Sequence, residues 1–257
     1  MRKLVGGCAI GCGLLVVVCI VLAVMGVNWV RSTYLSPKPP DPRIGKSVAL
    51  RPTFVLRTGG SYQAGTAVAV RLQPRKAPIV LTALHLFGPA GGLDKDLAPP
   101  FLDQVIREVL LTPLGAKKPT GRARGALRKT GFALKPEDPD VSSDIAAFAL
   151  VPGSKVNALD LSATNPRLGE WVWLVGDVVD HQPQTQRLFP ARVMVASDKG
   201  TMVKFESSFR LQAFSGAPLV NVKREVAGIL IGGSEEGGMA VINPAASIRR
   251  RLAESGL

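Results

Sequence analysis

Three short segments of the 257-residue chain hold residue types that could together perform nucleophilic catalysis. They are residues 81–85 (LTALH), 142–146 (SSDIA) and 214–219 (FSGAPL). A serine hydroxyl is a poor nucleophile at neutral pH unless an imidazole takes its proton, and the imidazole needs a buried carboxylate to fix its tautomer. His85, Asp144 and Ser215 are therefore the candidates for base, orienting acid and nucleophile of a hydrolase.

The choice of a general base is narrow, because the chain contains 2 histidines. His85 ends an apolar run over 78–84 that predicts a buried strand, and a Phe-Gly-Pro loop signal follows it. A strand end would present this side chain rigidly to a cleft. His181 lies in the polar, turn-rich segment 176–183, where we expect a solvated surface histidine.

Taken in order, the three segments resemble the TAAH, DIAL and GDSGGPLV motifs of trypsin-like (chymotrypsin-fold) serine proteases of a membrane-anchored bacterial type. Supporting segments at 65–70, 227–233 and 241–244 extend the resemblance over roughly 44–252. In the alternative interpretation, His85 is a satisfied core histidine, Asp144 caps a strand and Ser215 is an ordinary turn residue.

The resemblance implies an all-β fold of two six-stranded antiparallel β-barrels with a C-terminal helix. We expect a protease domain over 47–252, with barrel one at about 47–151 and barrel two at about 166–246. Short apolar runs broken by Gly, Pro and Asn independently favour an all-β domain. The runs are 54–56, 67–72, 79–84, 109–111, 145–151, 171–175, 192–196, 202–205, 218–222, 226–231 and 239–242. We also expect a helix within 93–108 and a basic one over 247–254.

The resemblance also assigns the substrate site. The backbone N–H groups of Ala213 and Ser215 would hold the oxyanion. Phe209, six residues before the nucleophile, would lie at the base of the primary specificity pocket, and the wall would be formed by Ile231, Gly232 and Gly233. An apolar, partly filled pocket favours cleavage after small or aliphatic residues. We expect a protein or peptide substrate, no cofactor and no metal.

Three residues depart from the family pattern around the nucleophile. Ala213 stands where the family has glycine, Phe214 where zymogen-activated trypsins have aspartate, and Ile231 where a serine supports the triad aspartate. These changes leave a second hypothesis open, in which a catalytically weak or inactive trypsin-like domain acts as a membrane-anchored binding or sensing module.

An uncharged apolar segment over 4–30 predicts a transmembrane helix before the domain. About 20 apolar residues suffice to span a bilayer, and a cleaved signal peptide would have a shorter core with a small-residue site after it. We therefore expect an anchor over 1–30 and a proline-rich linker over 31–46. Arg2 and Lys3 favour a cytoplasmic N-terminus, with the domain outside the cytoplasmic membrane. All 3 cysteines lie in the anchor, so the domain contains no disulfide.

The net charge of +13 raises the question of an anionic partner. The densest basic run is 117–129, which the resemblance places in a variable loop. It contains no aromatic residue that could stack on bases, so we expect no specific nucleic acid. A solvated surface loop and attraction to anionic lipid or polymer remain the two interpretations.

Overall fold

The computed structural model describes residues 36–73, 76–97, 99–126, 140–179, 181, 184–234 and 238–256. The chain divides into two compact units, Met1–Lys38 and Pro39–Leu257. All the strands and helices below belong to the second unit. The expected membrane segment, the start of the linker over 31–35 and residues 127–129 of the basic run lie outside the described residues. In the described ranges, no helix has the length and apolar character needed to cross a membrane.

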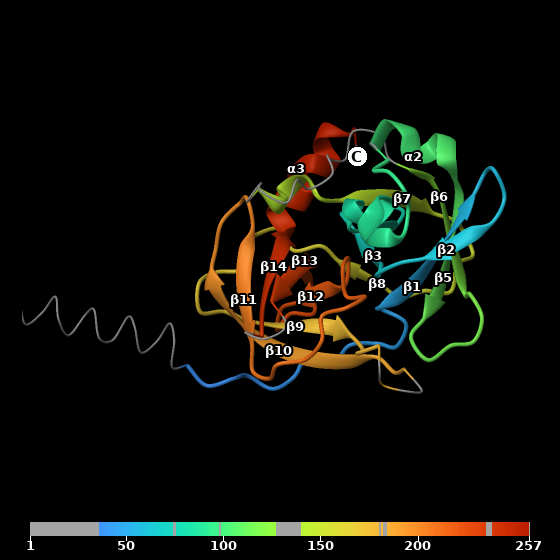
Figure 1. Cartoon of the computed structure of the whole chain (residues 1–257). Coiled ribbons are helices and arrows are strands. Elements are labelled where there is room, and N and C mark those ends of the chain that lie inside the picture. The colour runs from blue at the N-terminus through green and yellow to red at the C-terminus, as the bar shows by residue number, and fades with distance from the viewer. Residues whose placement is uncertain are drawn as a thin grey trace, which may run out of the picture. The chain divides into compact units, whose positions relative to one another are not determined.

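The first half of the larger unit is an eight-stranded sheet in the order β2-β1-β5-β6-β7-β4-β3-β8 (Figure 1). Its strands are β1 (Leu50–Leu56), β2 (Ser61–Gln63), β3 (Val68–Arg71), β4 (Ile79–Thr82), β5 (Ile106–Pro113), β6 (Gly121–Ala126), β7 (Ala146–Leu150) and β8 (Ala158–Asp160). Neighbouring strands are antiparallel except β8, which runs parallel to β3.

The expectation of a closed six-stranded first barrel is wrong, because this half is a curled, open sheet. β1 and β3 meet in a bridge between Leu50 and Ala67, whose N–H···O distances are 3.0 and 2.8 Å. Beyond this bridge, β1 pairs with β2 and β3 pairs with β8, so each edge already has another partner. The loop predicted for the basic run is also wrong over 121–126, which form β6 between β5 and β7.

The second half is a closed barrel, as expected, with the strand order β10-β11-β14-β13-β12-β9. Its strands are β9 (Trp171–Gly176), β10 (Arg187–Val195), β11 (Thr201–Phe205), β12 (Pro218–Val220), β13 (Val226–Ser234) and β14 (Met239–Pro244). Helix α3 (Ala245–Glu254) follows the last strand. Helix α2 is shorter than the helix expected within 93–108, covering Pro99–Val105, because Ile106 already begins β5.

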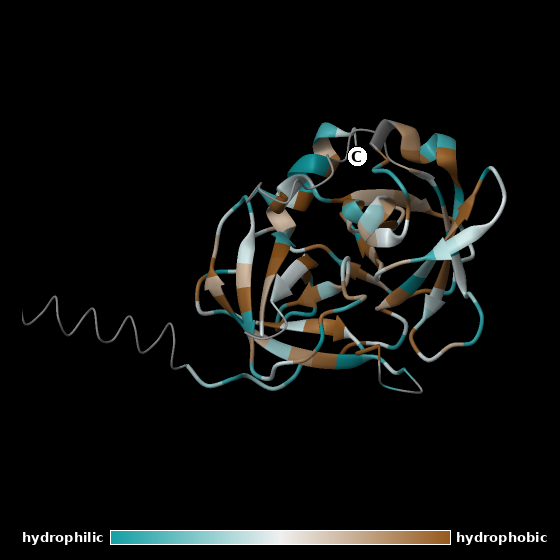
Figure 2. Cartoon of the chain, viewed as in Figure 1, coloured by the Kyte–Doolittle hydropathy of each residue, from teal (hydrophilic) through white to brown (hydrophobic). Residues whose placement is uncertain are grey.

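Buried apolar side chains form three clusters. One cluster lies within the sheet around Phe54 and Phe148, and a second lies within the barrel around Leu174. The third joins the two halves, since it contains Leu81 of β4, Trp173 of β9 and residues of α3. Figure 2 shows the hydrophobic colour concentrated on the strands and hydrophilic residues on the outer turns of α3. A site between the halves is therefore positioned by a shared core.

Part of the expected linker packs on the barrel. Pro42 is buried, and Asp41 Oδ1 accepts a 2.8 Å hydrogen bond from Nε1 of the fully buried Trp173. We expect Asp41→Ala to lower the free energy of unfolding by about 1–3 kcal/mol, because the indole N–H loses its acceptor. Urea denaturation measures this loss, with Asp41→Asn as the control that keeps an acceptor. Equal losses in both variants would contradict the role of this bond.

Candidate active site

His85 and Asp144 form a close pair at the ends of neighbouring strands. β4 and β7 pair in a register that places Thr82 opposite Ala146. His85 follows β4 in the 3-10 helix η1 (Leu84–Phe87), and Asp144 follows the 3-10 helix η3 (Val141–Ser143), just before β7. The sheet thus brings together two segments that the sequence separates by 59 positions.

Both carboxylate oxygens of Asp144 accept hydrogen bonds from His85. Oδ2 lies 2.6 Å from Nδ1, and Oδ1 accepts from the His85 backbone N–H at 3.0 Å. The Asp144 side chain is fully buried, whereas 18% of the His85 side chain is exposed. Because Nδ1 donates to the carboxylate, Nε2 is left as the acceptor nitrogen of the ring. In the described residues, Asp144 accepts from no further donor, and Ile231, expected to stand where the family has a supporting serine, is buried and offers no side-chain donor.

Ser215 lies in a tight turn that packs directly against the histidine segment. Gly216 has φ of +84°, and a Cβ there would approach Thr66 O to 2.2 Å and Ala83 N to 3.0 Å. Glycine is required both for this left-handed backbone and for the close approach. The Ser215 carbonyl accepts from the Thr66 backbone N–H at 2.8 Å. The fold therefore gathers the three sequence segments at one place.

Two threonines that the sequence analysis did not identify support this turn. Thr82 Oγ1 donates to Thr66 O at 2.7 Å, and Thr66 Oγ1 donates to Ala213 O at 2.9 Å. In the sequence both residues resemble ordinary strand formers, since threonine is common in strands. The sequence indicates a special role for them only through their position near the histidine motif and near Gly65. Their acceptors are backbone carbonyls of other segments, which the sequence alone does not identify.

Ala213 adopts the backbone conformation that the family glycine would supply. Its φ is +65°, a region that costs a residue with a Cβ about 1–2 kcal/mol. Among the described residues, neither the Ala213 nor the Ser215 backbone N–H donates to a protein acceptor, and Ala213 is exposed. Both N–H groups are free to bind an anionic oxygen from a ligand.

The Ser215 hydroxyl is directed to a carbonyl rather than to the histidine. Oγ donates to Ile231 O at 3.3 Å, and His85 Nε2 makes no hydrogen bond within the described ranges. An O–H···O bond of this length is long. The bond that holds the hydroxyl in this rotamer is therefore weak.

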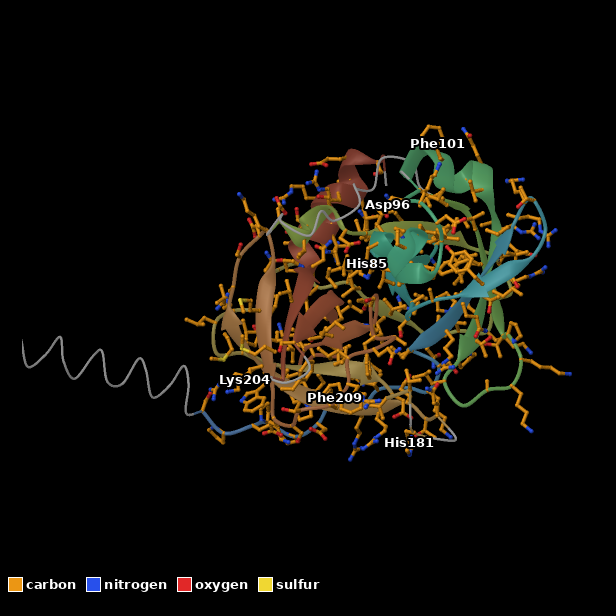
Figure 3. All side chains as sticks on the ribbon, in the orientation of Figure 1. His85, Asp96, Phe101, His181, Lys204 and Phe209 are labelled. Carbon is orange, nitrogen blue, oxygen red and sulfur yellow. The ribbon has the colours of Figure 1, made fainter. Side chains whose placement is uncertain are left out.

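Phe209 belongs to an aromatic cluster of the barrel. Its ring centroid lies 4.4 Å from Phe189, 4.9 Å from Phe205 and 5.7 Å from Phe214. Phe209 is half-buried beside β10, whereas His85 lies where the sheet and the barrel meet (Figure 3). Phe214 is buried, and a Cβ on Gly176 would come within 2.3 Å of its ring. Apolar packing thus anchors the residue before the nucleophile.

The two glycines after Ile231 differ in their surroundings. A Cβ on Gly232 would meet no atom within 4 Å, so the space beside it is open. A Cβ on Gly233 would lie 2.7 Å from Leu211 Cδ1. Leu211 therefore closes one side of this wall with an apolar side chain. Within the described ranges, no group of three or more His, Cys, Asp or Glu residues could hold a metal ion.

The arrangement of sheet and barrel matches the fold of solved serine proteases. The Rv3671c protease of M. tuberculosis in its inactive form aligns at 17% identity and a TM-score of 0.51, covering 82% of this chain and 90% of that one. The chain has the trypsin-like serine protease fold. The thermostable serine protease AL20 from an extremophilic microorganism aligns with this trypsin-like chain at 12% identity and a TM-score of 0.56, covering 80% and 95% of the two chains.

A serine endoprotease from Yersinia pestis gives a third structural match. Its alignment to the trypsin-like chain has 14% identity and a TM-score of 0.52, and it covers 82% of this chain and 63% of that one. No protein-family model and no curated protein matches the sequence. The trypsin-like fold is therefore recognised through the structure and through the short motifs.

Proposed function

We propose that the chain is a membrane-tethered serine endopeptidase that uses His85, Asp144 and Ser215. The observation that supports this most directly is the His85–Asp144 pair, in which a fully buried carboxylate accepts from Nδ1 at 2.6 Å. The Ser215 turn packs against the same histidine segment. Such a pair leaves Nε2 as the ring nitrogen that can accept a proton, which is what serine hydrolysis requires of its base.

In this mechanism, Ser215 Oγ attacks the carbonyl carbon of the scissile peptide bond. His85 Nε2 takes the hydroxyl proton and then delivers it to the leaving amine, while Asp144 stabilises the imidazolium. The Ala213 and Ser215 N–H groups hold the oxyanion of the tetrahedral intermediate. Water, activated by the same imidazole, then hydrolyses the acyl-enzyme and restores Ser215.

The proposed specificity is for a small or aliphatic residue before the scissile bond. Leu211 lies against Gly233 of the proposed wall, and the space beside Gly232 is open. Phe209 is assigned to the pocket by its position six residues before Ser215. A lysine in such a pocket would lose hydration without gaining a counter-ion.

The proposed membrane tether is supported by the sequence. The uncharged run over 4–30 is long enough to span a bilayer, and Arg2 and Lys3 favour a cytoplasmic N-terminus. The domain would then lie outside the cytoplasmic membrane. Exposed basic residues at 117, 118, 122 and 124 support attraction to anionic lipid or polymer as an accessory contact.

The second candidate function is an inactive binding or sensing module with the same fold. The hydrogen bond of Ser215 Oγ to Ile231 O favours it, because the nucleophile is turned from its base. The strained Ala213 would contribute in the same direction if it weakened oxyanion binding.

A fluorophosphonate probe distinguishes the two candidates. The purified full chain in neutral detergent is expected to be labelled at Ser215, and Ser215→Ala and His85→Ala are expected to lose labelling. His181→Ala is the matched control, because it removes the other histidine and should label like the wild type. A folded wild-type chain that stays unlabelled, with its fold checked by circular dichroism, would support the binding module instead.

A further inference from the structure

A cavity of about 220 Å³ opens beside the nucleophile turn. Ala213 and Thr66 border it at one end, and Arg51 and Asp177 contribute its charged groups. The remaining walls combine the apolar Pro52, Ala64, Leu114 and Val179 with the polar Gln63 and with Gly65. A cavity of this character fits an apolar stem that ends in a polar or charged group.

The position of this cavity relates it to the leaving-group side of a substrate. Two backbone segments flank Ser215, because its Oγ contacts Ile231 O and its carbonyl contacts Thr66 N. The acyl half of a substrate would follow 231–233, as proposed above. The cavity is lined by Thr66 and by none of residues 231–233, so it lies on the other side of Ser215. The substrate residues after the scissile bond would therefore enter it.

The negative charge of Asp177 is already satisfied by the protein. Its side chain is fully buried, and Oδ2 accepts from His181 Nδ1 and from the Thr185 backbone N–H, both at 2.7 Å. Oδ1 accepts from the Val178 N–H at 2.9 Å, and Arg187 Nη1 lies 3.8 Å from it. His181 was expected to be a solvated surface residue. Its side chain is 41% exposed, but it also donates to the buried Asp177. Asp177 offers a ligand no open acceptor.

Arg51 is the charged group of the cavity that lacks a direct partner. Its side chain projects from β1 and is half-buried, and among the described residues its guanidinium donates no hydrogen bond and forms no ion pair. Burial lowers the pKa of Arg51 from its usual value, and the charge of Asp177 opposes this shift. Arginine nonetheless stays protonated in proteins. A partly desolvated guanidinium gains most from a carboxylate, which it can bind with two parallel hydrogen bonds.

We infer that Arg51 binds a carboxylate in the leaving-group segment of the substrate, within the first few residues after the scissile bond. This inference rests on the proposed endopeptidase function. The carboxylate is either an acidic side chain or the terminal carboxylate of a short substrate. The cavity therefore selects substrates by charge on one side of the bond, while the aromatic cluster selects by size on the other.

Peptide pairs that differ only in Glu against Gln test this inference with the full chain in neutral detergent. The acyl half is fixed with alanine before the scissile bond, and the pairs vary the first, second and third positions after it. Wild type is expected to prefer Glu at one of these positions by about tenfold in kcat/KM, the effect of one charge-assisted contact. Arg51→Gln should remove this preference, and Arg51→Lys should keep part of it. The control Arg250→Gln, at an exposed position of α3 outside the cavity, should leave it unchanged.

The same peptides with amidated and free C-termini separate the two sources of the carboxylate. A Glu preference that survives amidation assigns the carboxylate to the side chain. A preference for the free over the amidated terminus in the Gln peptides, lost in Arg51→Gln, assigns it to the terminal carboxylate. Equal rates for Glu and Gln peptides, together with equal rates for free and amidated termini, in wild type would overturn the inference.

A p-nitrophenyl ester of the acyl half reports the proposed function without using the cavity. Wild type and Arg51→Gln should hydrolyse it at the same rate. Ester hydrolysis with neither a Glu preference nor a preference for free C-termini would overturn the carboxylate site alone. If wild type does not hydrolyse the ester, the proposed function fails, and fluorescently labelled Ala-Glu and Ala-Gln amides then test the cavity by binding. Tighter binding of Ala-Glu that Arg51→Gln abolishes would support the site, and equal affinities would overturn it.

Discussion

Replacement of Asp144 by asparagine is expected to lower kcat/KM by about 10⁴-fold while the fold is retained. Both oxygens of Asp144 accept from His85, one from the backbone N–H and the other from Nδ1. Asparagine has one oxygen. If that oxygen stays on the backbone N–H, the amide NH₂ must donate to Nδ1. The imidazole proton then moves to Nε2, which can no longer accept the proton of Ser215.

Steady-state hydrolysis of a chromogenic peptide with an aliphatic residue before the scissile bond measures this loss. Asp140→Asn is the matched control, because Asp140 caps η3 through a 3.0 Å bond from Ser142 N, and asparagine keeps that acceptor. We expect the control to stay within about threefold of wild type, since cap substitutions of this kind cost little. Wild-type rates in Asp144→Asn would show that His85 does not depend on this carboxylate.

Cleavage after Ala, Val or Leu is expected to exceed cleavage after Lys by about a hundredfold or more, since an unpaired buried ammonium is costly. In the part of the chain that the structure describes, the side chains that we assign to the primary pocket are apolar: the aromatic cluster around Phe209, and Leu211. A peptide library that varies the residue before the scissile bond measures this ratio. Dominant cleavage after Lys or Arg would instead place an acid such as Glu206 in the pocket.

Phe209→Leu tests whether the aromatic cluster sets the depth of that pocket. The smaller side chain is expected to shift the preferred residue toward a larger one, such as Met or Phe. Phe189→Leu is the control, because Phe189 stacks on Phe209 at 4.4 Å but comes from β10 rather than from the loop before Ser215. An identical shift in both variants would mean that loosening of the cluster, and not Phe209 itself, changes the specificity.

The sequence predicts where the strands lie better than it predicts which sheet closes into a barrel. Apolar runs of β-branched residues identify central strands, because those residues are buried on a sheet. The short strands β2 and β8 contain no such run, yet they occupy the edges of β1 and β3 and keep the first sheet open. The alternating Gly, Ala and Arg residues of β6 likewise resembled a loop, although its small residues allow a strand between β5 and β7.

The sequence likewise identifies the reactive groups of the candidate site but not their supports. Motifs in the order His, Asp and Ser indicate which side chains could react. The supports of the turn are side-chain bonds from Thr66 and Thr82 to backbone carbonyls, and these depend on segments that meet only in the folded chain. The pairing of His181 with Asp177 escaped prediction for a related reason, because its polar surroundings indicate exposure and not a buried acid four residues away.

The hydrogen bonds from the Thr82 and Thr66 hydroxyls to backbone carbonyls have a consequence for the biosynthesis of the chain. Thr66 and Ala213 are 147 positions apart, so the bond between them forms only after the ribosome has delivered the later half. The N-terminal half is made first and already carries His85 and Asp144, but the turn bearing Ser215 is made only with the second half. A nascent chain therefore contains no assembled nucleophile. The proposed chemistry can begin only after both halves have been made and have docked.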